Sequence, residues 1–171
     1  TRIMYGGRIS LQVGFIVVIL ELIIGIIMGG LAGYYGGIVD MIIMRVVEIF
    51  GCIPFFPLMF IVATMMQAFN VSPQARIYVL MIVMGCVYWA SVARLVRGQI
   101  LTLREMEYMQ AAEATGIRVS RKIFKHLIPN VAPVLIVMAT MDLGGVILTE
   151  STLSFLGLGL SFPYASWGNM V

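Results

Sequence analysis

Long apolar runs alternate with short polar breaks along this chain, and one longer polar interval interrupts them. The apolar runs predict four membrane spans, at residues 10–33, 40–69, 77–96 and 131–159. An α-helix needs about 20 apolar residues to cross a hydrocarbon core roughly 30 Å thick, and these runs are long enough. We therefore expect an all-α, polytopic transmembrane helical bundle with about four spans, forming a single transmembrane domain over residues 1–171.

Glycines and prolines give the first two spans distinct features. Three glycines of the first span recur every four residues and so share one face, namely Gly25, Gly29 and Gly33. Small residues on one face let another helix approach closely. The second span carries Pro54 and Pro57, and each proline removes a backbone donor. We expect a turn at residues 34–37 and a kink at the two prolines.

The polar interval covers residues 94–130 and holds seven of the eleven basic residues of the chain: Arg94, Arg97, Arg104, Arg118, Arg121, Lys122 and Lys125. Its strong helix formers predict a helix over 102–115 that breaks at Gly116. A second short helix should run over 117–127 and end before Pro129, because a proline disfavours helical geometry in the preceding residue. The interval is thus predicted to form a helical hairpin at residues 102–128, followed by Asn130 as the cap of the fourth span.

Composition supports a membrane protein and gives its orientation. Hydrophobic residues make up 61% of the chain and charged residues 11%, with a mean hydropathy of +1.03. Soluble domains carry about 25% charged residues, and nucleic-acid binding requires a basic face, so neither class fits. If residues 94–130 are cytoplasmic, eight basic residues lie inside and three outside, as the positive-inside rule demands. Both ends of the sequence would then face outward.

Three acids lie within the predicted spans, and they are candidate residues of a translocation path: Glu21, Asp142 and Glu150. A charge inside a bilayer is costly and should face protein or a water-filled cavity. These acids would favour cationic or amine-bearing solutes, but a hydrogen-bonded structural role explains them equally well. Cys52 and Cys86 also lie in apolar runs. We interpret them as small buried hydrophobes, with neither a disulfide nor a metal site expected.

Enzyme chemistry is not expected of this chain. It has no HExxH or GxSxG motif, and its single histidine, His126, lies in the polar hairpin. It also lacks a Gly-x-x-x-x-Gly-Lys-Ser/Thr phosphate loop, so we expect it to bind no ATP and no other cofactor. An ion-coupled secondary transporter remains an alternative, because the three intramembrane acids would suit an ion relay. The absence of an inverted repeat weakens that alternative.

The hairpin segment QAAEATGIRVSRKIFKHLIP resembles the EAA loop of ABC importer permeases. That loop has the pattern Glu-Ala-Ala, three residues, Gly, nine residues and Ile-x-Leu-Pro. Five residues occupy matching positions, although Gln110 replaces the acid: Gln110, Ala111, Ala112, Gly116 and Pro129. Two further positions depart from the pattern, with His126 in place of Ile and Ile128 in place of Leu. The resemblance implies an ATPase-docking loop to which Thr115 and His126 also belong.

Further segments resemble the dipeptide/oligopeptide/nickel permeases, among them GLAGYYGGIVD, FKHLIPNVAPVLIV and ESTLSFLGLGL. The resemblance implies a multi-pass permease subunit in the plasma membrane of a prokaryote. It also implies a homologous second permease subunit, two cytoplasmic ATPases that bind ATP and Mg²⁺, and an extracytoplasmic solute-binding protein. The lipid bilayer surrounds such a subunit, and no nucleic acid is involved.

The resemblance also implies a longer protein, with one further span on each side of the 171 residues. The substrate stays open between peptides, nickel and other small solutes, and we favour peptides. In such a permease the hairpin would move as a rigid body when the ATPases close, and Gly116 would fix its bend. That movement would re-angle the flanking spans.

Overall fold

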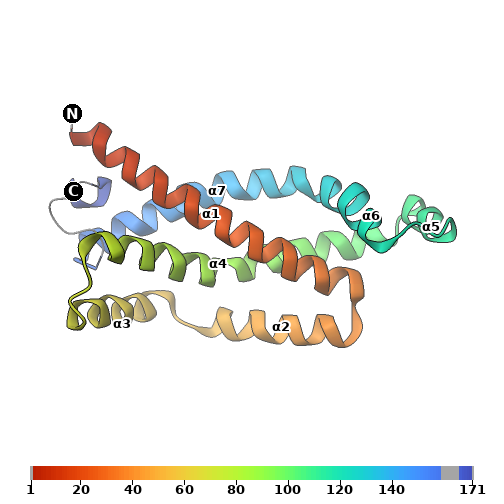
Figure 1. Cartoon of the computed structure of the whole chain (residues 1–171), viewed down its shortest axis with the longest axis horizontal. Coiled ribbons are helices and arrows are strands. Elements are labelled where there is room, and N and C mark those ends of the chain that lie inside the picture. Colours follow the sequence, from red (N-terminus) through yellow and green to blue (C-terminus); the bar gives the residue numbers. More distant parts are fainter. Residues whose placement is uncertain (1, 159–165, 171) are drawn as a thin grey trace.

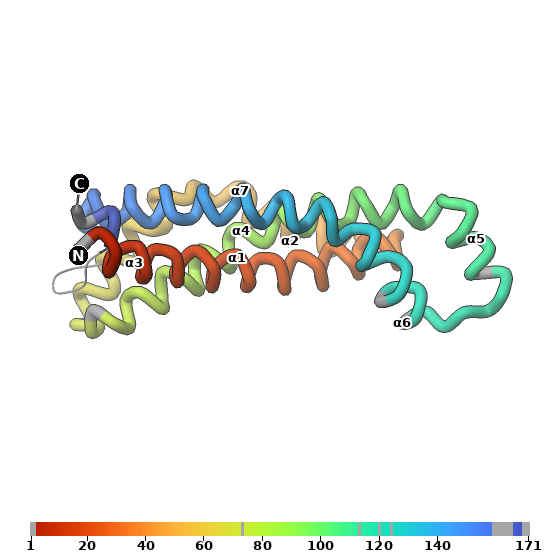
Figure 2. Tube along the Cα trace, turned by 90° about the horizontal axis from the view of Figure 1, so that it is seen from above, coloured from red at the N-terminus to blue at the C-terminus, as the bar shows by residue number. Residues whose placement is uncertain are grey.

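The computed structural model describes residues 2–158 and 166–170, and the described residues are helical without any strand. The elements in order are α1 (Arg2–Tyr35), α2 (Gly37–Cys52), α3 (Phe55–Ala68), α4 (Pro73–Arg104), α5 (Glu107–Ala114), α6 (Val119–Lys122), the π-helical η1 (Ile123–Leu127), α7 (Ile128–Phe155) and the 3₁₀ turn η2 (Trp167–Met170). Helices α1, α4 and α7 run along the length of the molecule (Figures 1 and 2). Helices α5 and α6 lie at one end, and both chain ends lie at the other.

The described residues contain three candidate membrane spans, or four if a bent helix pair is counted as one span, in agreement with the predicted number of about four. Helix α1, helix α4 and the segment of residues 125–155 are each long and apolar enough to cross a membrane. Helices α2 and α3 pass the same test together, as a pair bent by 75° at the intervening break. Pro54 lies directly before α3, while Pro57 lies in its first turn, where a missing N–H has no helical partner to lose. The pair runs between the two ends of the molecule in Figure 1, and it makes a fourth candidate crossing if it is counted as one broken span.

Several predicted helix ends are wrong because helices continue past the apolar segments. Helix α1 begins at Arg2 rather than at residue 10, and α4 runs to Arg104 rather than to 96. The predicted hairpin helix over 102–115 is therefore two elements, with its first residues in α4 and a break at Glu105 and Met106. Ser72 caps α4 as its Oγ accepts a hydrogen bond from the Ala75 N–H at 3.4 Å. Hydropathy marks the lipid-facing part of a helix and not its polar extensions. The predicted end of the fourth span at residue 159 lies outside the described residues.

The predicted helix end before Pro129 is also wrong. Ile128 has helical backbone angles, with φ −57° and ψ −46°, and the chain stays helical from Val119 to Phe155. A π-helical turn precedes the proline, in which the Ile128 N–H donates to the Ile123 carbonyl five residues earlier. Such a turn shifts the hydrogen-bond ladder by one residue and can admit a proline ring without ending the helix. Asn130 is not a cap, since its Nδ2 donates to the His126 carbonyl at 2.6 Å within the helix.

The glycine face of α1 packs against α4, as predicted. A Cβ added at any of the three glycines would collide with α4: with Val92 for Gly25, with Ala93 for Gly29 and with Ile100 for Gly33. At Gly33 the added atom would lie 2.9 Å from the Ile100 Cβ. Because lipid is as apolar as the side chains, helix association in a membrane depends on such close van der Waals packing. The seam between α1 and α4 is therefore the central contact of the bundle.

Buried apolar side chains form three clusters around α4. One joins α1, α3, α4 and α7 toward the chain termini, around Val17, Met59 and Met84. A second joins α4, α5 and α7 near the hairpin, and the third packs α2 on α1 and α4. The prediction that Cys52 and Cys86 are buried is wrong, because both thiols are exposed and free on this chain. Both cysteines lie at outward-facing positions of their helices, α2 and α4.

Candidate functional site

The hairpin turns at Gly116, as the sequence predicts. Gly116 has φ +68°, a backbone conformation that a residue with a Cβ rarely adopts. The Ile117 N–H donates to the Ala112 carbonyl at 3.2 Å, and the Thr115 N–H donates to the Ala111 carbonyl at 3.1 Å. This arrangement is typical of a helix that ends in a left-handed glycine. The bend after α5 is therefore fixed by backbone geometry.

The residues predicted to dock an ATPase differ in exposure. Five of them are exposed, one is half-buried and one is buried: Gln110, Ala111, Thr115, Gly116 and Pro129, then His126, then Ala112. The Ala112 side chain is only 6% exposed because it faces the chain itself. The two neighbouring alanines therefore point to opposite surroundings. A partner protein can reach Ala111 without any rearrangement of the hairpin, whereas Ala112 contributes to its interior.

Gln110 has a structural role in the break between α4 and α5. Its Nε2 donates to the Glu105 carbonyl at 3.1 Å, which ties the start of α5 to the end of α4. A carboxylate at this position has no proton to donate and would not make this bond. The glutamine that departs from the EAA pattern thus fits its local surroundings.

The base of the hairpin contacts three spans, α1, α4 and α7. Met109 of α5 belongs to the same buried cluster as Leu127 and Val131 at the start of α7. The Arg104 guanidinium at the end of α4 donates to the Tyr34 carbonyl of α1 at 3.1 Å. The Lys122 ammonium lies 6.0 Å from the centre of the Tyr34 ring. A displacement of the hairpin would therefore reach α1, α4 and α7 directly.

An ion pair near the same end attaches α2 to α4, and sequence reasoning missed it. The Arg97 guanidinium binds the Asp40 carboxylate with two nitrogens, of which Nη2 donates to Oδ2 at 2.6 Å. Two parallel hydrogen bonds of this kind fix orientation as well as distance. The residues are 57 positions apart, so no local pattern relates them. The exposed pair of Arg45 and Glu48, by contrast, is three residues apart and follows from helical spacing.

Of the three acids inside the bundle, Glu150 has hydrogen-bond partners that explain it. Its carboxylate is 6% exposed and accepts from the Ser10 hydroxyl at 3.1 Å and from the Ser154 hydroxyl at 2.8 Å. The Ser10 hydroxyl also accepts from the backbone N–H of Trp167 at 3.3 Å, which attaches η2 to the Glu150 cluster. Glu150 therefore joins α1, α7 and η2. This placement favours the structural interpretation of Glu150 over a place in a translocation path.

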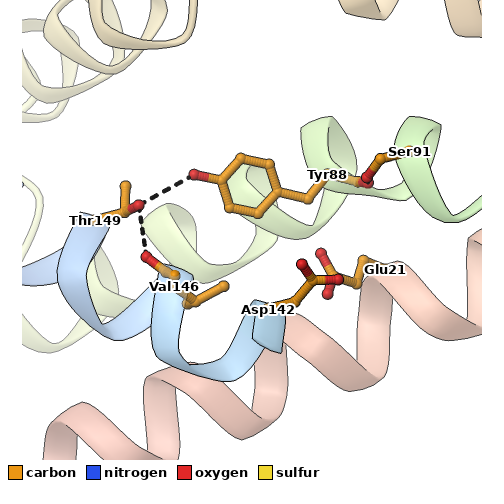
Figure 3. A pocket seen from close by; sticks show the side chains of 7 residues that line it. Glu21, Tyr88, Ser91, Asp142, Val146 and Thr149 are labelled. Carbon is orange, nitrogen blue, oxygen red and sulfur yellow. Dashed lines mark hydrogen bonds between the residues drawn. The ribbon is translucent and has the colours of Figure 1, made fainter. Parts of the chain in front are cut away.

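The other two acids face each other in a pocket. Glu21 of α1 and Asp142 of α7 point their carboxyl groups toward one another, with Tyr88 of α4 above them (Figure 3). They line a cavity of about 180 Å³ together with Ser91, Gly145, Val146 and Thr149. Glu21 is 1% exposed, while Asp142 is half-buried. The structure thus brings together two of the three acids that the sequence singled out.

Three hydroxyl groups complete the polar lining, and sequence reasoning did not find them. The Tyr88 hydroxyl donates to Thr149 Oγ1 at 3.4 Å, and Thr149 Oγ1 donates to the Gly145 carbonyl at 2.8 Å. Ser91 Oγ donates to the Tyr88 carbonyl at 2.8 Å. Isolated hydroxyl residues are common in membrane helices, so their sequence positions carried no signal. Within residues 2–158 and 166–170, no group of three or more His, Cys, Asp or Glu side chains is placed to hold a metal ion.

These features define a polytopic helical membrane protein with a polar hairpin at one end and an acidic pocket midway through its bundle. The chain belongs to the family of binding-protein-dependent transport system inner membrane components, whose sequence pattern matches residues 22–171. This family assignment agrees with the resemblance found in the hairpin and the flanking spans.

Three relatives illustrate the similarity. The chain is 41% identical to the oligopeptide transport system permease protein OppC of Haemophilus influenzae, 40% identical to the dipeptide transport system permease protein DppC of Bacillus subtilis and 39% identical to OppC of Escherichia coli K12. Each comparison covers 99% of this chain, and 52%, 51% and 54% of the respective relative. The chain therefore spans about half the length of the curated relatives it matches.

Proposed function

We propose that this chain forms the central spans of a permease subunit in an ATP-driven importer of di- and oligopeptides. The observation that carries the proposal is its identity of about 40% to peptide permeases along 99% of its length. The subunit would pair with a homologous permease and receive substrate from an extracytoplasmic binding protein. Two cytoplasmic ATPases would supply the energy, with ATP and Mg²⁺ bound to them and not to this chain.

The hairpin at residues 102–128 is proposed as the element that docks an ATPase. Its exposed small and polar side chains around Ala111 and Thr115 support this role, because they leave room for a partner surface. The fixed bend at Gly116 and the attachments of Arg104 and Met109 to the spans also support it. A hairpin that moves as one body with the ATPase would tilt α1, α4 and α7 together, a hinge-type transition.

One observation favours a second candidate, an ion-coupled transporter. The facing carboxyl groups of Glu21 and Asp142 lie inside the bundle, where acids often belong to ion or proton paths. The energy source separates the two candidates. Uptake of trialanine into vesicles should require ATP and should persist after ionophores remove all ion gradients. Uptake that stops with the ionophores would favour the ion-coupled candidate, and uptake of Ni²⁺ in place of trialanine would identify a nickel importer.

Cross-linking from the hairpin tests the docking role, and the neighbouring alanines supply a matched pair. Ala111→Cys and Ala112→Cys are placed separately in the full-length chain after Cys52 and Cys86 are replaced by serine. Each variant is co-expressed with the ATPase subunit and treated with a short reagent that couples to the cysteine thiol at one end and, on illumination, to any neighbouring group at the other. Ala111→Cys should give an adduct whose yield changes when nucleotide is added. Ala112→Cys should give several-fold less, because its side chain faces the interior of the hairpin.

The outcome distinguishes a coupling element from a connector. An adduct from Ala111→Cys that responds to nucleotide supports docking at the exposed face. Equal yields from both positions would contradict the hairpin geometry. No adduct from either variant in an assembled, membrane-inserted complex would show that the hairpin only connects two spans.

A further inference from the structure

The acidic pocket lies near the middle of the bundle. Glu21, Tyr88 and Asp142 are each close to the midpoint of their own helices, which span Arg2–Tyr35, Pro73–Arg104 and Ile128–Phe155. Those three helices run along the length of the molecule (Figure 2). The pocket therefore lies at the depth where lipid tails would surround the protein. A polar site at that depth is costly and calls for an explanation.

The carboxyl groups of this pocket have unused hydrogen-bonding capacity. Glu21 Oε1 and Asp142 Oδ2 are fully buried, and neither has a hydrogen-bond partner in the part of the chain that the structure describes. Glu21 is 99% buried as a residue and points into the cavity. A buried polar atom without a partner is rare in native proteins and indicates a missing ligand, ion or water.

The rest of the lining supplies acceptors rather than donors. The Tyr88 hydroxyl proton is directed to Thr149, and the Thr149 hydroxyl proton to the Gly145 carbonyl. Ser91 donates its proton to the Tyr88 carbonyl and keeps its lone pairs free. No lysine, arginine or histidine lines the cavity. One oxygen of each carboxyl group, Glu21 Oε1 and Asp142 Oδ2, and the Ser91 hydroxyl oxygen can therefore accept hydrogen bonds from a ligand.

We infer that this pocket binds a primary ammonium group, with Glu21, Asp142 and Ser91 each accepting one of its three N–H bonds. A cation bound between the two carboxyl groups stabilises their charged forms, and the low dielectric of the bundle strengthens that attraction. The cavity of about 180 Å³ holds the amino end of a larger solute and not the whole of it. If the proposed function holds, this solute is a peptide whose α-amino group passes the pocket during translocation.

Carbodiimide labelling tests this inference without changing the protein. The intact complex in vesicles is treated with dicyclohexylcarbodiimide, an apolar reagent that couples to carboxyl groups inside membranes. Mass spectrometry then gives the labelling rates of Glu21 and Asp142, with Glu150 as the matched buried acid outside the pocket. Probes are added separately at constant pH and ionic strength: methylammonium, trialanine, N-acetyl-trialanine and Ni²⁺. At ten times its Kd, a probe that occupies the site should slow labelling about tenfold.

Methylammonium and trialanine should slow the labelling of Glu21 and Asp142, while N-acetyl-trialanine, which has no ammonium group, should not. The Glu150 rate should stay constant throughout. Unchanged rates with both amines, or protection by Ni²⁺ alone, would overturn the inference.

This result separates the inference from the proposed function. Protection by methylammonium in a complex that does not take up trialanine would support the ammonium site and contradict the peptide importer. Trialanine uptake without any protection would support the importer and contradict the site.

A pair of variants gives a second readout. Asp142→Asn and Glu21→Gln each keep the size of the side chain but remove its charge, so either should raise the KM for trialanine uptake. Loss of one hydrogen bond to a charged group corresponds to a change of about tenfold or more. An unchanged KM in both variants would overturn the inference.

Discussion

Two buried glutamates, Glu150 and Glu21, lie on membrane-spanning helices and differ in what surrounds them. Glu150 accepts hydrogen bonds from Ser10 and Ser154 and joins the ends of α1 and α7. Glu21 faces a second carboxyl group, and its Oε1 has no partner among the described residues. Burial alone therefore does not distinguish a structural acid from a functional one.

The two glutamates differ in the hydrogen-bond donors that surround their carboxyl groups. A buried carboxylate is tolerable when hydroxyl or amide groups bond to it, and such a group then stabilises the fold. A carboxylate that lacks donors costs stability, and it persists where a ligand or a function offsets that cost. By this criterion we assign Glu150 to the structural core and propose that Glu21 belongs to a binding site. Mutations of the two acids should therefore separate stability from transport.

The largest loss of stability should follow from a bulky side chain in the seam between α1, which carries Glu21, and α4. Gly29→Leu would drive a side chain into the Ala93 backbone of α4 and should cost about 3 kcal/mol of unfolding free energy. Gly30→Leu is the matched control, since the nearest atom to its added Cβ is Ile100 Cδ1 at 3.9 Å. Unfolding of the purified complex in detergent measures both. Equal losses would contradict the packing of α1 on α4.

A smaller loss is expected where the partnered acid is removed. Glu150→Ala takes away the acceptor of two serine hydroxyls inside the bundle and should cost about 2 kcal/mol. Glu150→Gln keeps an acceptor oxygen and should cost less than half as much. The same unfolding experiment applies, and transport per folded complex should be unchanged in Glu150→Gln. A specific loss of transport there would place Glu150 in the translocation path after all.

Removing one donor of Glu150 should cost about 1 kcal/mol. Ser10→Ala removes the hydroxyl that donates to Glu150 and accepts from the Trp167 N–H. Ser91→Ala is the matched control, because among the described residues the Ser91 hydroxyl donates to a carbonyl of its own helix, that of Tyr88. Its unfolding free energy should change by less than about 0.5 kcal/mol. A Ser10→Ala variant as stable as the original chain would show that the Glu150 cluster adds no stability.

The smallest change in stability is expected at the unpartnered acid. Glu21→Gln keeps the volume of the side chain and replaces a carboxyl group whose Oε1 has no donor, so its unfolding free energy should stay within about 0.5 kcal/mol of the original or rise slightly. A loss of more than about 2 kcal/mol would mean that Glu21 has a stabilising partner and that the comparison with Glu150 fails.

Features with local signals were predictable from the sequence. Apolar run lengths gave the four crossings, and the four-residue spacing of Gly25, Gly29 and Gly33 gave the packing face of α1. The turn at Gly116 followed because glycine adopts positive φ more readily than other residues. The helix continues through Pro129 because the π-helical turn before it shifts the hydrogen-bond ladder by one residue. No residue pattern in the sequence predicts such a turn.

Features that join distant segments were not predictable. Glu150 and Glu21 have the same chemistry in sequence, and only the contact with Ser10, 140 residues away, distinguishes them. The opposite surroundings of Ala111 and Ala112 depend on how α5 packs on the rest of the chain. The Arg97–Asp40 pair and the hydroxyl lining of the pocket likewise arise only when α1, α2, α4 and α7 assemble.

Uptake of trialanine by vesicles that contain the intact complex tests the central claim most directly. The double variant Glu21→Gln/Asp142→Asn is compared with Glu150→Gln, with each rate divided by the amount of folded complex. We predict that the uptake rate per folded complex is at least about tenfold lower in the double variant than in the original chain. The rate of Glu150→Gln should equal that of the original chain. Equal ratios in the two variants would contradict the account, since the unpartnered acids would then have no more part in transport than the partnered one.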